Sequence, residues 1–267
     1  MSVAAARHPF DAVAAGYDSA FSRSTLGTWL RAAVRERLAA SFAPGELILE
    51  LGCGTGDDAV WLAARGTRVM ATDAAAAMLE LTRAKAEAAG LSHLVRTAAL
   101  DLREADALPR QASRVDGAFS NFGALNCVPD RRRVARLLSA SVRPGGRVLL
   151  IVMGPFCAWE TAWHLARGRV KDAFRRARSG AEAHVGGGGI VRVWYPSPGR
   201  LRAEFGPSFR HVRTAGLGVL LPPSYLASLV ERRRGVFEHC AHSDRRLAKT
   251  AWSAHIADHY IMELERR

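Results

Sequence analysis

Strand and helix signals alternate through the middle of the chain, and this alternation constrains the fold more than any other feature. Short apolar runs at 47–52, 68–72, 94–100, 115–122 and 147–153 each fit a buried strand. The segments between them carry apolar residues at helical spacing and mostly end at glycines. Regular alternation of this kind predicts right-handed βαβ units, and therefore a parallel sheet that is covered by helices on both faces.

A glycine-rich loop follows the first expected strand and leads into the first helix of this region. It reads Glu50-Leu-Gly-Cys-Gly-Thr-Gly-Asp-Asp58, and such a turn lets backbone amides and a helix N-terminus approach a ligand closely. A dinucleotide-binding fingerprint needs its third glycine where Asp57 stands, and the Gly-Lys-Ser/Thr of a Walker loop is absent. Two acids would repel a pyrophosphate, so the loop predicts a nucleotide-like ligand without phosphate. We expect both acids to interact with the helix dipole.

Acidic residues end the next two expected strands. Asp73 lies 21 residues after Gly52, where a carboxylate can accept hydrogen bonds from both hydroxyls of a ribose. Asp101 ends the third strand, where a carboxylate or the adjacent amide can bind the amino group of an adenine. A ligand that contains ribose and adenine but no phosphate fits S-adenosylmethionine (SAM).

With these motifs the sequence resembles the class I SAM-dependent methyltransferases over residues 9–153 and again at 257–263, which is similar to their last, antiparallel strand. The turn at 143–146 and the Phe10–Asp18 element, which in such enzymes closes over the cofactor, also fit. The resemblance implies a Rossmann-like, mostly parallel seven-stranded sheet with helices on both faces. It also implies that these residues bind SAM: Tyr17, Glu50, Gly52, Cys53, Gly54, Gly56, Asp73, Ala74, Met78, Asp101, Leu102, Asn121 and Phe122.

We expect a single α/β domain made of four parts. Residues 1–42 form a helical N-terminal cover, 43–153 the SAM-binding core, 154–208 an inserted lid or substrate region, and 209–267 the C-terminal part of the fold. The insert is far longer than a strand connection needs, which indicates a role of its own.

The last third of the chain contains four further expected elements. Residues 158–178 fit one helix, either continuous or broken at Gly168. A glycine-rich turn and a strand follow within 185–195, the sixth strand spans 211–221, and a helical stretch covers 224–234.

The net charge of +13 is distributed unevenly along the chain. Residues 1–42 and 43–153 each carry +2, whereas 154–267 carry +9. Arginines account for 35 of the 38 basic residues, which is partly typical of a GC-rich genome. The surplus therefore lies beside the expected substrate entrance, where it suits an acidic substrate, an anionic membrane surface or a nucleic acid.

The resemblance implies methyl transfer, by in-line displacement, to a small-molecule acceptor that is acidic or partly lipophilic and belongs to secondary metabolism. An RNA or other nucleic-acid methyltransferase is the alternative. However, the segment after the fourth strand lacks the Asn/Asp-Pro-Pro-Tyr/Phe run that base-modifying relatives use, so no nucleic-acid partner is expected. A third interpretation makes the basic insert a membrane-contact surface of a peripheral enzyme that acts on a lipophilic substrate. We favour a lid.

As a lid, the insert would place aromatic residues over the methyl group and arginines against an acidic acceptor. The substrate candidates are Trp159, Trp163, Arg175 and Arg176. A general base is needed only if the acceptor must lose a proton of high pKa. The candidates for a base or a positioning group are His164, His184, Tyr195 and Asn126.

The remaining composition points to a reduced, cytoplasmic protein. The four cysteines, at positions 53, 127, 157 and 240, form no CxxC pair, and no ligand cluster predicts a metal. The N-terminus lacks an apolar run typical of a signal peptide, and the longest apolar stretch, 148–153, is too short for a transmembrane segment. We expect a monomer or homodimer.

Overall fold

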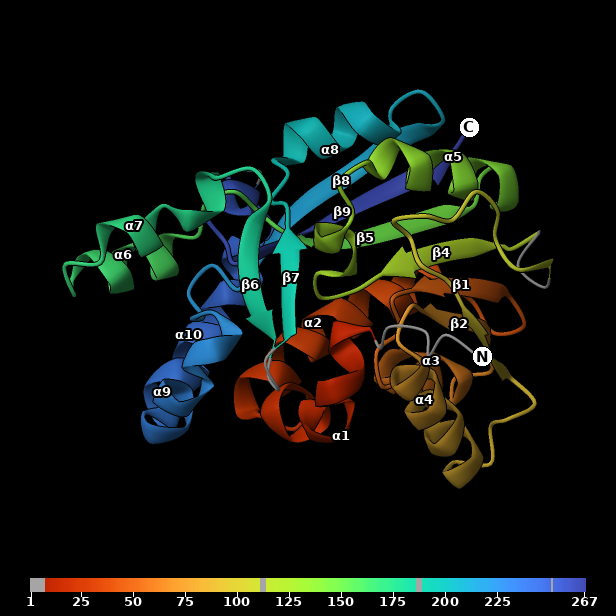
Figure 1. Cartoon of the computed structure of the whole chain (residues 1–267), viewed down its shortest axis with the longest axis horizontal. Coiled ribbons are helices and arrows are strands. Elements are labelled where there is room, and N and C mark those ends of the chain that lie inside the picture. Colours follow the sequence, from red (N-terminus) through yellow and green to blue (C-terminus); the bar gives the residue numbers. More distant parts are fainter. Residues whose placement is uncertain (1–7, 111–113, 186–188, 251) are drawn as a thin grey trace, which may run out of the picture.

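The centre of the protein is one seven-stranded sheet (Figure 1). The computed structural model describes residues 8–110, 114–185, 189–250 and 252–267. The strand order is β3–β2–β1–β4–β5–β9–β8. The strands are β1 (Leu47–Leu51), β2 (Arg68–Asp73), β3 (Val95–Ala99), β4 (Gly117–Ser120), β5 (Arg147–Met153), β8 (Phe209–Leu217) and β9 (His259–Arg266).

Six strands run parallel to one another, and the last strand in the sequence runs against them. β9 pairs antiparallel with both β5 and β8, so it lies inside the sheet and β8 forms the edge. This confirms the predicted seven-stranded, mostly parallel sheet with an antiparallel last strand. The predicted bounds of the last two strands were shifted: β8 begins at Phe209 and β9 begins at His259.

Helices cover both faces of the sheet, as predicted. Successive residues of a strand point to opposite faces, so Leu150 of β5 packs in one cluster while Leu149 and Ile151 pack in the other. The helices of the first face are α5 (Arg131–Ser141) and α8 (Pro198–Phe205). The second face is covered by α2 (Thr25–Ser41), α3 (Asp57–Ala63), α4 (Ala76–Ala88), α9 (Ala227–Arg232) and α10 (Arg234–Leu247).

The insert after β5 contains less helix and more strand than the sequence indicates. A continuous helix over 158–178 is wrong, because α6 (Ala158–Leu165) ends before Gly168, whose φ of 67° is left-handed. The chain resumes in α7 (Val170–Ala173) and a 3₁₀ turn, η5 (Arg175–Ala177). An antiparallel hairpin follows, of which only the second strand was predicted: β6 (Ala181–Val185) and β7 (Gly189–Val193).

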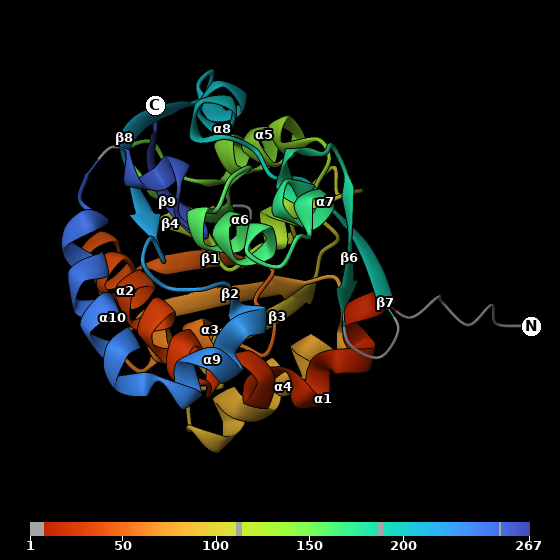
Figure 2. The same cartoon turned by 90° about the vertical axis from the view of Figure 1, so that its left-hand side faces the viewer.

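The hairpin lies beside the N-terminal cover (Figure 2). Both of its strands contact η1 (Pro9–Val13), which leads through α1 (Ala14–Tyr17) and η2 (Asp18–Ser22) into α2. The predicted glycine-rich turn of the hairpin falls largely on 186–188, outside the described residues. The helical stretch predicted to end at position 234 continues as α10 to Leu247.

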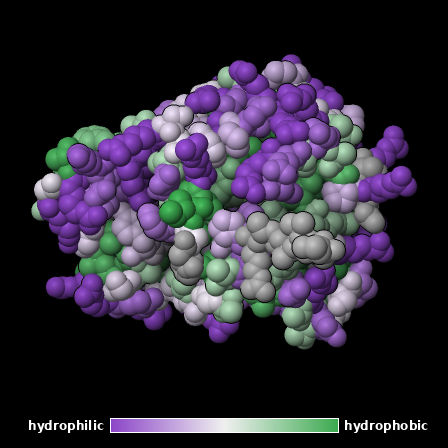
Figure 3. Space-filling view, in the orientation of Figure 1, coloured by the Kyte–Doolittle hydropathy of each residue, from purple (hydrophilic) through white to green (hydrophobic). Residues whose placement is uncertain are grey.

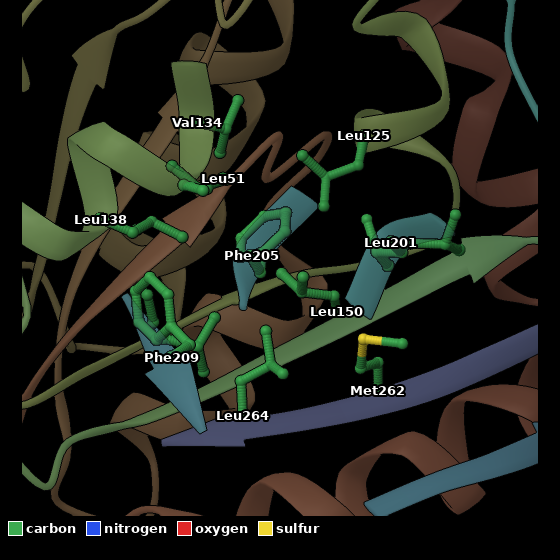
Figure 4. Packing of buried hydrophobic residues seen from close by; sticks show 14 of the residues in the cluster. Leu51, Leu125, Val134, Leu138, Leu150, Leu201, Phe205, Phe209, Met262 and Leu264 are labelled. Carbon is green, nitrogen blue, oxygen red and sulfur yellow. The ribbon is translucent and has the colours of Figure 1, made fainter. Parts of the chain in front are cut away.

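Phe205 lies at the centre of the first cluster, between α8 and the sheet (Figure 4). Its side chain is fully buried and its ring centroid lies 5.9 Å from that of Phe209. Phe205→Ala is therefore expected to lower the free energy of unfolding by about 3–5 kcal/mol, because it leaves a cavity that the packed sheet cannot close. Phe174→Ala is the matched control, since that ring is 50% exposed. Equal losses in chemical denaturation of the two variants would contradict this packing.

Candidate active site

The glycine loop joins β1 to α3 at the carboxyl edge of the sheet. Gly52 and Gly56 have φ values of 73° and 81°, and both are packed tightly. A Cβ at Gly52 would overlap Ala124, and one at Gly56 would lie 2.6 Å from a Thr82 methyl. Gly54 has no neighbour within 4 Å of a Cβ position, and it lines the cavity described below. The loop is thus held against its neighbours on two sides and left open toward a ligand.

Asp73 ends β2 directly beside this loop. Its two carboxylate oxygens accept hydrogen bonds of 2.9 Å from the backbone amides of Gly54 and Ala75. Burial raises the pKa of Asp73, although these amides favour its charged form. The carboxylate is therefore fixed in orientation and still presents lone pairs to the cavity, as binding of a ribose requires.

Asp101 lies beyond β3 on the other side of the same cavity. Arg103 donates to both of its carboxylate oxygens, and this ion pair lowers the pKa of Asp101. Leu102, which stands between these two residues in the sequence, is buried and also lines the cavity. The pair presents an apolar side chain and a fixed carboxylate at one place, a combination that suits an adenine ring and its amino group.

Two buried carboxylates lie beneath the glycine loop, at the end of β1 and the start of α3. Asp58 is 2% exposed and forms ion pairs with Arg31 and Arg35 of α2, the latter at 3.0 Å. Asn121, at the end of β4, donates to Asp58 at 2.6 Å. Glu50 is 1% exposed, and its Oε2 has no hydrogen-bond partner among the described residues. Burial and the neighbouring Asp58 raise the pKa of Glu50 well above its ordinary value.

The N-terminal cover is attached to the loop by acidic residues. Asp18 accepts a hydrogen bond from Thr55 and lies 2.6 Å from the Lys85 ammonium. Asp11 accepts from the amide of Ala77 at the start of α4. Although burial opposes it, Lys85 also holds the pKa of Asp57 below its ordinary value. Asp57 and Asp58 therefore both interact with cations at the first turn of α3.

The cover, the carboxyl edge of the sheet and the hairpin enclose a cavity of about 1010 Å³. This is at the upper end of the volumes that hold one drug-sized ligand, so the cavity has room for two smaller molecules. Its lining has two different ends. The loop end carries Glu50, Asp58, Asp73 and Asp101, whereas the hairpin end carries valines and tyrosines described below.

All but one of the residues predicted to bind SAM line this cavity. Gly56 is the exception, because it faces Thr82 instead. Burial raises the pKa of Tyr17 and, well above its ordinary value, that of Cys53. The thiol of Cys53 thus stays protonated and is not a nucleophile. Phe122 has a φ of 41°, rare for a residue other than glycine.

The candidate substrate residues divide into two groups. Arg175 and Arg176 line the cavity, and both guanidinium groups bind Glu160. Trp159 and Trp163 are not among the lining residues: Trp159 donates to the carbonyl of Leu220, and Trp163 lies under Arg167.

The candidate bases divide in the same way. Tyr195 and His184 line the cavity, but His164 and Asn126 do not. His164 is within 3.2 Å of the Tyr225 hydroxyl. Asn126 uses its whole amide group to connect β5 to the hairpin, since it donates to the carbonyls of Met153 and Trp194 and accepts from the Met153 amide.

Sequence reasoning missed several residues of the cavity. Arg31 and Lys85, which neutralise the acids of the loop, come from helices whose charges could not be paired without a fold. Asp258 and His259 also line the cavity, at the start of β9. Both residues lie inside the segment predicted as the last strand. Because that strand was predicted to be antiparallel, its first residues could have been expected at the carboxyl edge of the parallel strands.

Comparisons with known proteins identify the family of the chain. A family profile described as "Methyltransferase domain" matches residues 48–146. A ubiquinone/menaquinone biosynthesis C-methyltransferase of Acidiphilium cryptum is 38% identical over 53% of this chain and 55% of the relative. A demethylmenaquinone methyltransferase of Symbiobacterium thermophilum is 30% identical over 64% of this chain and 72% of the relative. The chain belongs to the class I SAM-dependent methyltransferases.

The similarity to the first relatives is partial, and the similarity of fold is wider. The chain spans about half the length of the first two curated relatives, 55% in each case. The CcbJ methyltransferase of Streptomyces caelestis superposes with a TM-score of 0.62 at 17% identity, over 97% of this chain and 98% of that one. This methyltransferase therefore shares the family fold along nearly its whole length.

The residues of this methyltransferase fit SAM as the cofactor of the family. Oε2 of Glu50, which has no hydrogen-bond partner among the described residues, and the carboxylate of Asp73 offer acceptors at the loop end that suit the ammonium group and the ribose of SAM. A phosphate ligand would be repelled there. Among the described residues no group of three or more His, Cys, Asp or Glu side chains is arranged to hold a metal ion.

The substitution Glu50→Gln should affect cofactor binding and the stability of the folded protein in opposite directions. Because the folded pKa of Glu50 is raised, the stability of the ligand-free protein falls as pH rises from about 4.5 toward that higher value. The variant should lose this part of the pH dependence and melt at or above the wild-type temperature at neutral pH. It should also bind S-adenosylhomocysteine at least ~10-fold more weakly, because one charge-assisted hydrogen bond is lost.

Calorimetric titration and thermal unfolding between pH 4 and 8 measure both effects. Glu87→Gln on the exposed face of α4 is the matched control. An unchanged affinity together with an unchanged pH profile in Glu50→Gln would show that Glu50 does not face the ligand.

Proposed function

We propose that this chain transfers the methyl group of SAM to a small, partly lipophilic acceptor with a quinol-type ring. The observation that carries the proposal is the two-ended cavity. Its loop end carries acids, and its hairpin end combines valines and tyrosines with Arg175 and Arg176, whose guanidinium groups are both paired with Glu160. The names of the relatives also support a quinol-type acceptor. They include a ubiquinone/menaquinone C-methyltransferase, demethylmenaquinone methyltransferases and 2-phytyl-1,4-naphthoquinone methyltransferases.

The hairpin supplies the apolar wall of the acceptor end. Val191 and Val193 are two residues apart on β7 and therefore point to the same face, and both line the cavity. Ile190, on the opposite face, is 50% exposed. Tyr195 and Tyr225 add aromatic surface at the same end. A flat aromatic ring with an apolar substituent suits such a lining better than a strongly charged metabolite.

The residues of the chain have three tasks in this reaction. When bound, SAM supplies a methyl group on a positively charged sulfur. Asp73, Asp101 and the glycine loop orient the nucleoside, and Glu50 provides a charge partner at the loop end. The cover and the hairpin exclude water from both ends, so the acceptor can be held in line with the transferred group.

The proposal predicts a specific pattern of methyl acceptors. Protein incubated with methyl-labelled SAM under anaerobic conditions should label a 2-prenyl-1,4-naphthohydroquinone, because its ring and side chain match the apolar end. Total RNA, offered in parallel, should remain unlabelled. Labelling of RNA but not of the quinol, measured by scintillation counting after extraction, would contradict the proposal and favour the nucleic-acid alternative.

A second proposal concerns how a lipophilic acceptor reaches the cavity: the insert contacts an anionic bilayer. α6 and α7 project from one end of the molecule, where hydrophobic atoms lie among hydrophilic ones (Figure 3). Leu165, Val170 and Phe174 are 44%, 57% and 50% exposed there. Exposed basic residues lie between them, including Arg167 and Lys171. Apolar side chains beside cations suit an anionic lipid surface.

No helix in the described part of the chain is long and apolar enough to cross a bilayer.

Sedimentation with lipid vesicles tests this contact. The protein should sediment with vesicles containing phosphatidylglycerol and much less with neutral phosphatidylcholine vesicles, and about 0.5 M salt should release it. Val170→Ser with Phe174→Ser should reduce binding, whereas Val236→Ser, at an exposed position on α10, should not. Equal binding of both variants to anionic vesicles would place the contact elsewhere.

A further inference from the structure

A chain of buried charges runs from the insert to the acceptor end of the cavity. Glu160 of α6 accepts from Arg176 of η5 at 2.7 Å, and the same guanidinium group lies 2.5 Å from Asp258 Oδ1. The other carboxylate oxygen of Asp258 lies 3.0 Å from Nδ1 of His259. All four side chains are at most 6% exposed. The chain of charges ends at His259, which lines the cavity.

The direction of β9 explains why this histidine lies at the site. Parallel strands bring their carboxyl ends to the cavity, and an antiparallel strand brings its amino end to the same edge. His259 is the first residue of β9 and is paired with Met153, the last residue of β5, and with Leu217, the last of β8. It therefore occupies a strand-end position equivalent to those of the cofactor residues.

The imidazole ring of His259 contacts Phe122 and Asp258 and also faces the cavity. The ring of Phe122, expected at the methionine part of SAM, lies edge-on to it at 5.7 Å. Asp258 lies on the Nδ1 side, and Arg176 donates both to its Oδ1 and to its main-chain carbonyl, which holds this carboxylate in place. The 3.0 Å contact of the buried Nδ1 with Asp258 is an ion-pair distance and lacks hydrogen-bond geometry. Nε2 takes part in none of the side-chain hydrogen bonds of the described residues, and the ring lines the cavity.

The charges around His259 form matched pairs, and an ionised carboxylate lies beside its Nδ1. Burial opposes it, but His259 and Arg176 hold the pKa of Asp258 well below its ordinary value, so Asp258 stays ionised. Of the two tautomers of a neutral imidazole, a carboxylate near Nδ1 favours the one with the proton on that nitrogen, which leaves the lone pair on Nε2. The arginines of the cluster, Arg175 and Arg176, are matched by Glu160 and Asp258. On the far side of Phe122, the Arg31 guanidinium is 5.2 Å from its ring and is matched by Asp58.

Resting on the proposed function, we propose that His259 is the general base for the methyl acceptor and that Asp258 positions it. The hydroxyl proton of the quinol moves to Nε2. The electron pair left on the oxygen, or on the ring carbon conjugated with it, forms the new bond to the methyl carbon, while the carbon–sulfur bond breaks and its pair remains on sulfur. On a ring carbon, the displaced hydrogen leaves as a proton and the oxygen regains a proton when the ring regains aromaticity. One proton is released to solvent in either case, and no oxidant is needed.

The other titratable groups of the acceptor end are less suited to this role. Burial raises the pKa of Tyr195 and of Tyr225, so both phenols keep their protons. His184 is exposed on β6 and has no carboxylate within ion-pair distance among the described residues. His259 alone among these combines burial, a fixed carboxylate partner and an open nitrogen.

Replacement of His259 should slow methyl transfer without weakening cofactor binding. His259→Gln is expected to lower single-turnover transfer to 2-prenyl-1,4-naphthohydroquinone by about 100-fold or more, the usual contribution of a general base. The Kd for S-adenosylhomocysteine should stay within about twofold of wild type. His259→Asn retains an amide donor toward Asp258 and serves as the variant with preserved packing. His242→Gln, on the exposed surface of α10, is the control.

A second readout needs no turnover. 4-Nitro-1-naphthol changes its visible absorbance on ionisation, so wild-type protein loaded with S-adenosylhomocysteine should bind it as the naphtholate at a pH where the free probe is mostly protonated. His259→Gln and His259→Asn should bind it as the neutral naphthol, and imidazole should restore transfer activity in His259→Gln.

The outcomes separate the two proposals. Unchanged turnover in both His259 variants, or equal ionisation of the probe in wild type and variants, would overturn the role of His259. Ionisation by wild type alone, without methylation of any quinol, would support the base and contradict the proposed acceptor.

Discussion

The ion pairs between Asp58 and the arginines of α2 are the interaction on which the cavity depends. Asp58 is the second residue of α3, Arg31 and Arg35 come from the N-terminal cover, and Asn121 comes from the end of β4. One buried carboxylate thus joins three segments that are distant in the sequence. Removal of one partner would leave a buried charge unpaired, which is far more costly than the loss of an exposed ion pair.

The same region also buries the carboxyl groups of Glu50 and Asp73, and the burial of ionised carboxyl groups lowers the stability of the ligand-free protein. Glu50 is buried beside Asp58 with an oxygen that has no partner among the described residues, and burial also raises the pKa of Asp73. A cationic ligand that binds only the folded state would relieve this cost and stabilise the protein by mass action. At the hairpin end the valines and tyrosines carry no charge, and the two arginines are already paired with Glu160, which suits an acceptor of different chemistry.

Much of this arrangement could be predicted from the sequence, because it depends on local signals. The alternation of strands and helices, the glycine loop and the acids after β2 and β3 correctly placed Asp73 and Asp101 at one cavity. Long-range contacts could not be predicted. Asn126 was a candidate positioning group, but its amide connects β5 to the hairpin. Arg176 was expected to bind an acidic acceptor, but its guanidinium group is paired with Glu160 and Asp258. His259 was missed because no local motif marks it, although the predicted antiparallel direction of its strand already places the start of that strand at the site.

A crystal structure of the complex with S-adenosylhomocysteine tests the central claim most directly. The account predicts that the ribose hydroxyls bind Asp73, that the adenine lies beside Asp101 and Leu102, and that the sulfur faces Phe122 with open space toward the hairpin. The Arg31–Asp58 pair should remain intact beneath it. The account would be contradicted if the ligand bound outside this cavity. It would also be contradicted if the loop end of the cavity were empty in crystals of protein that S-adenosylhomocysteine saturates in solution.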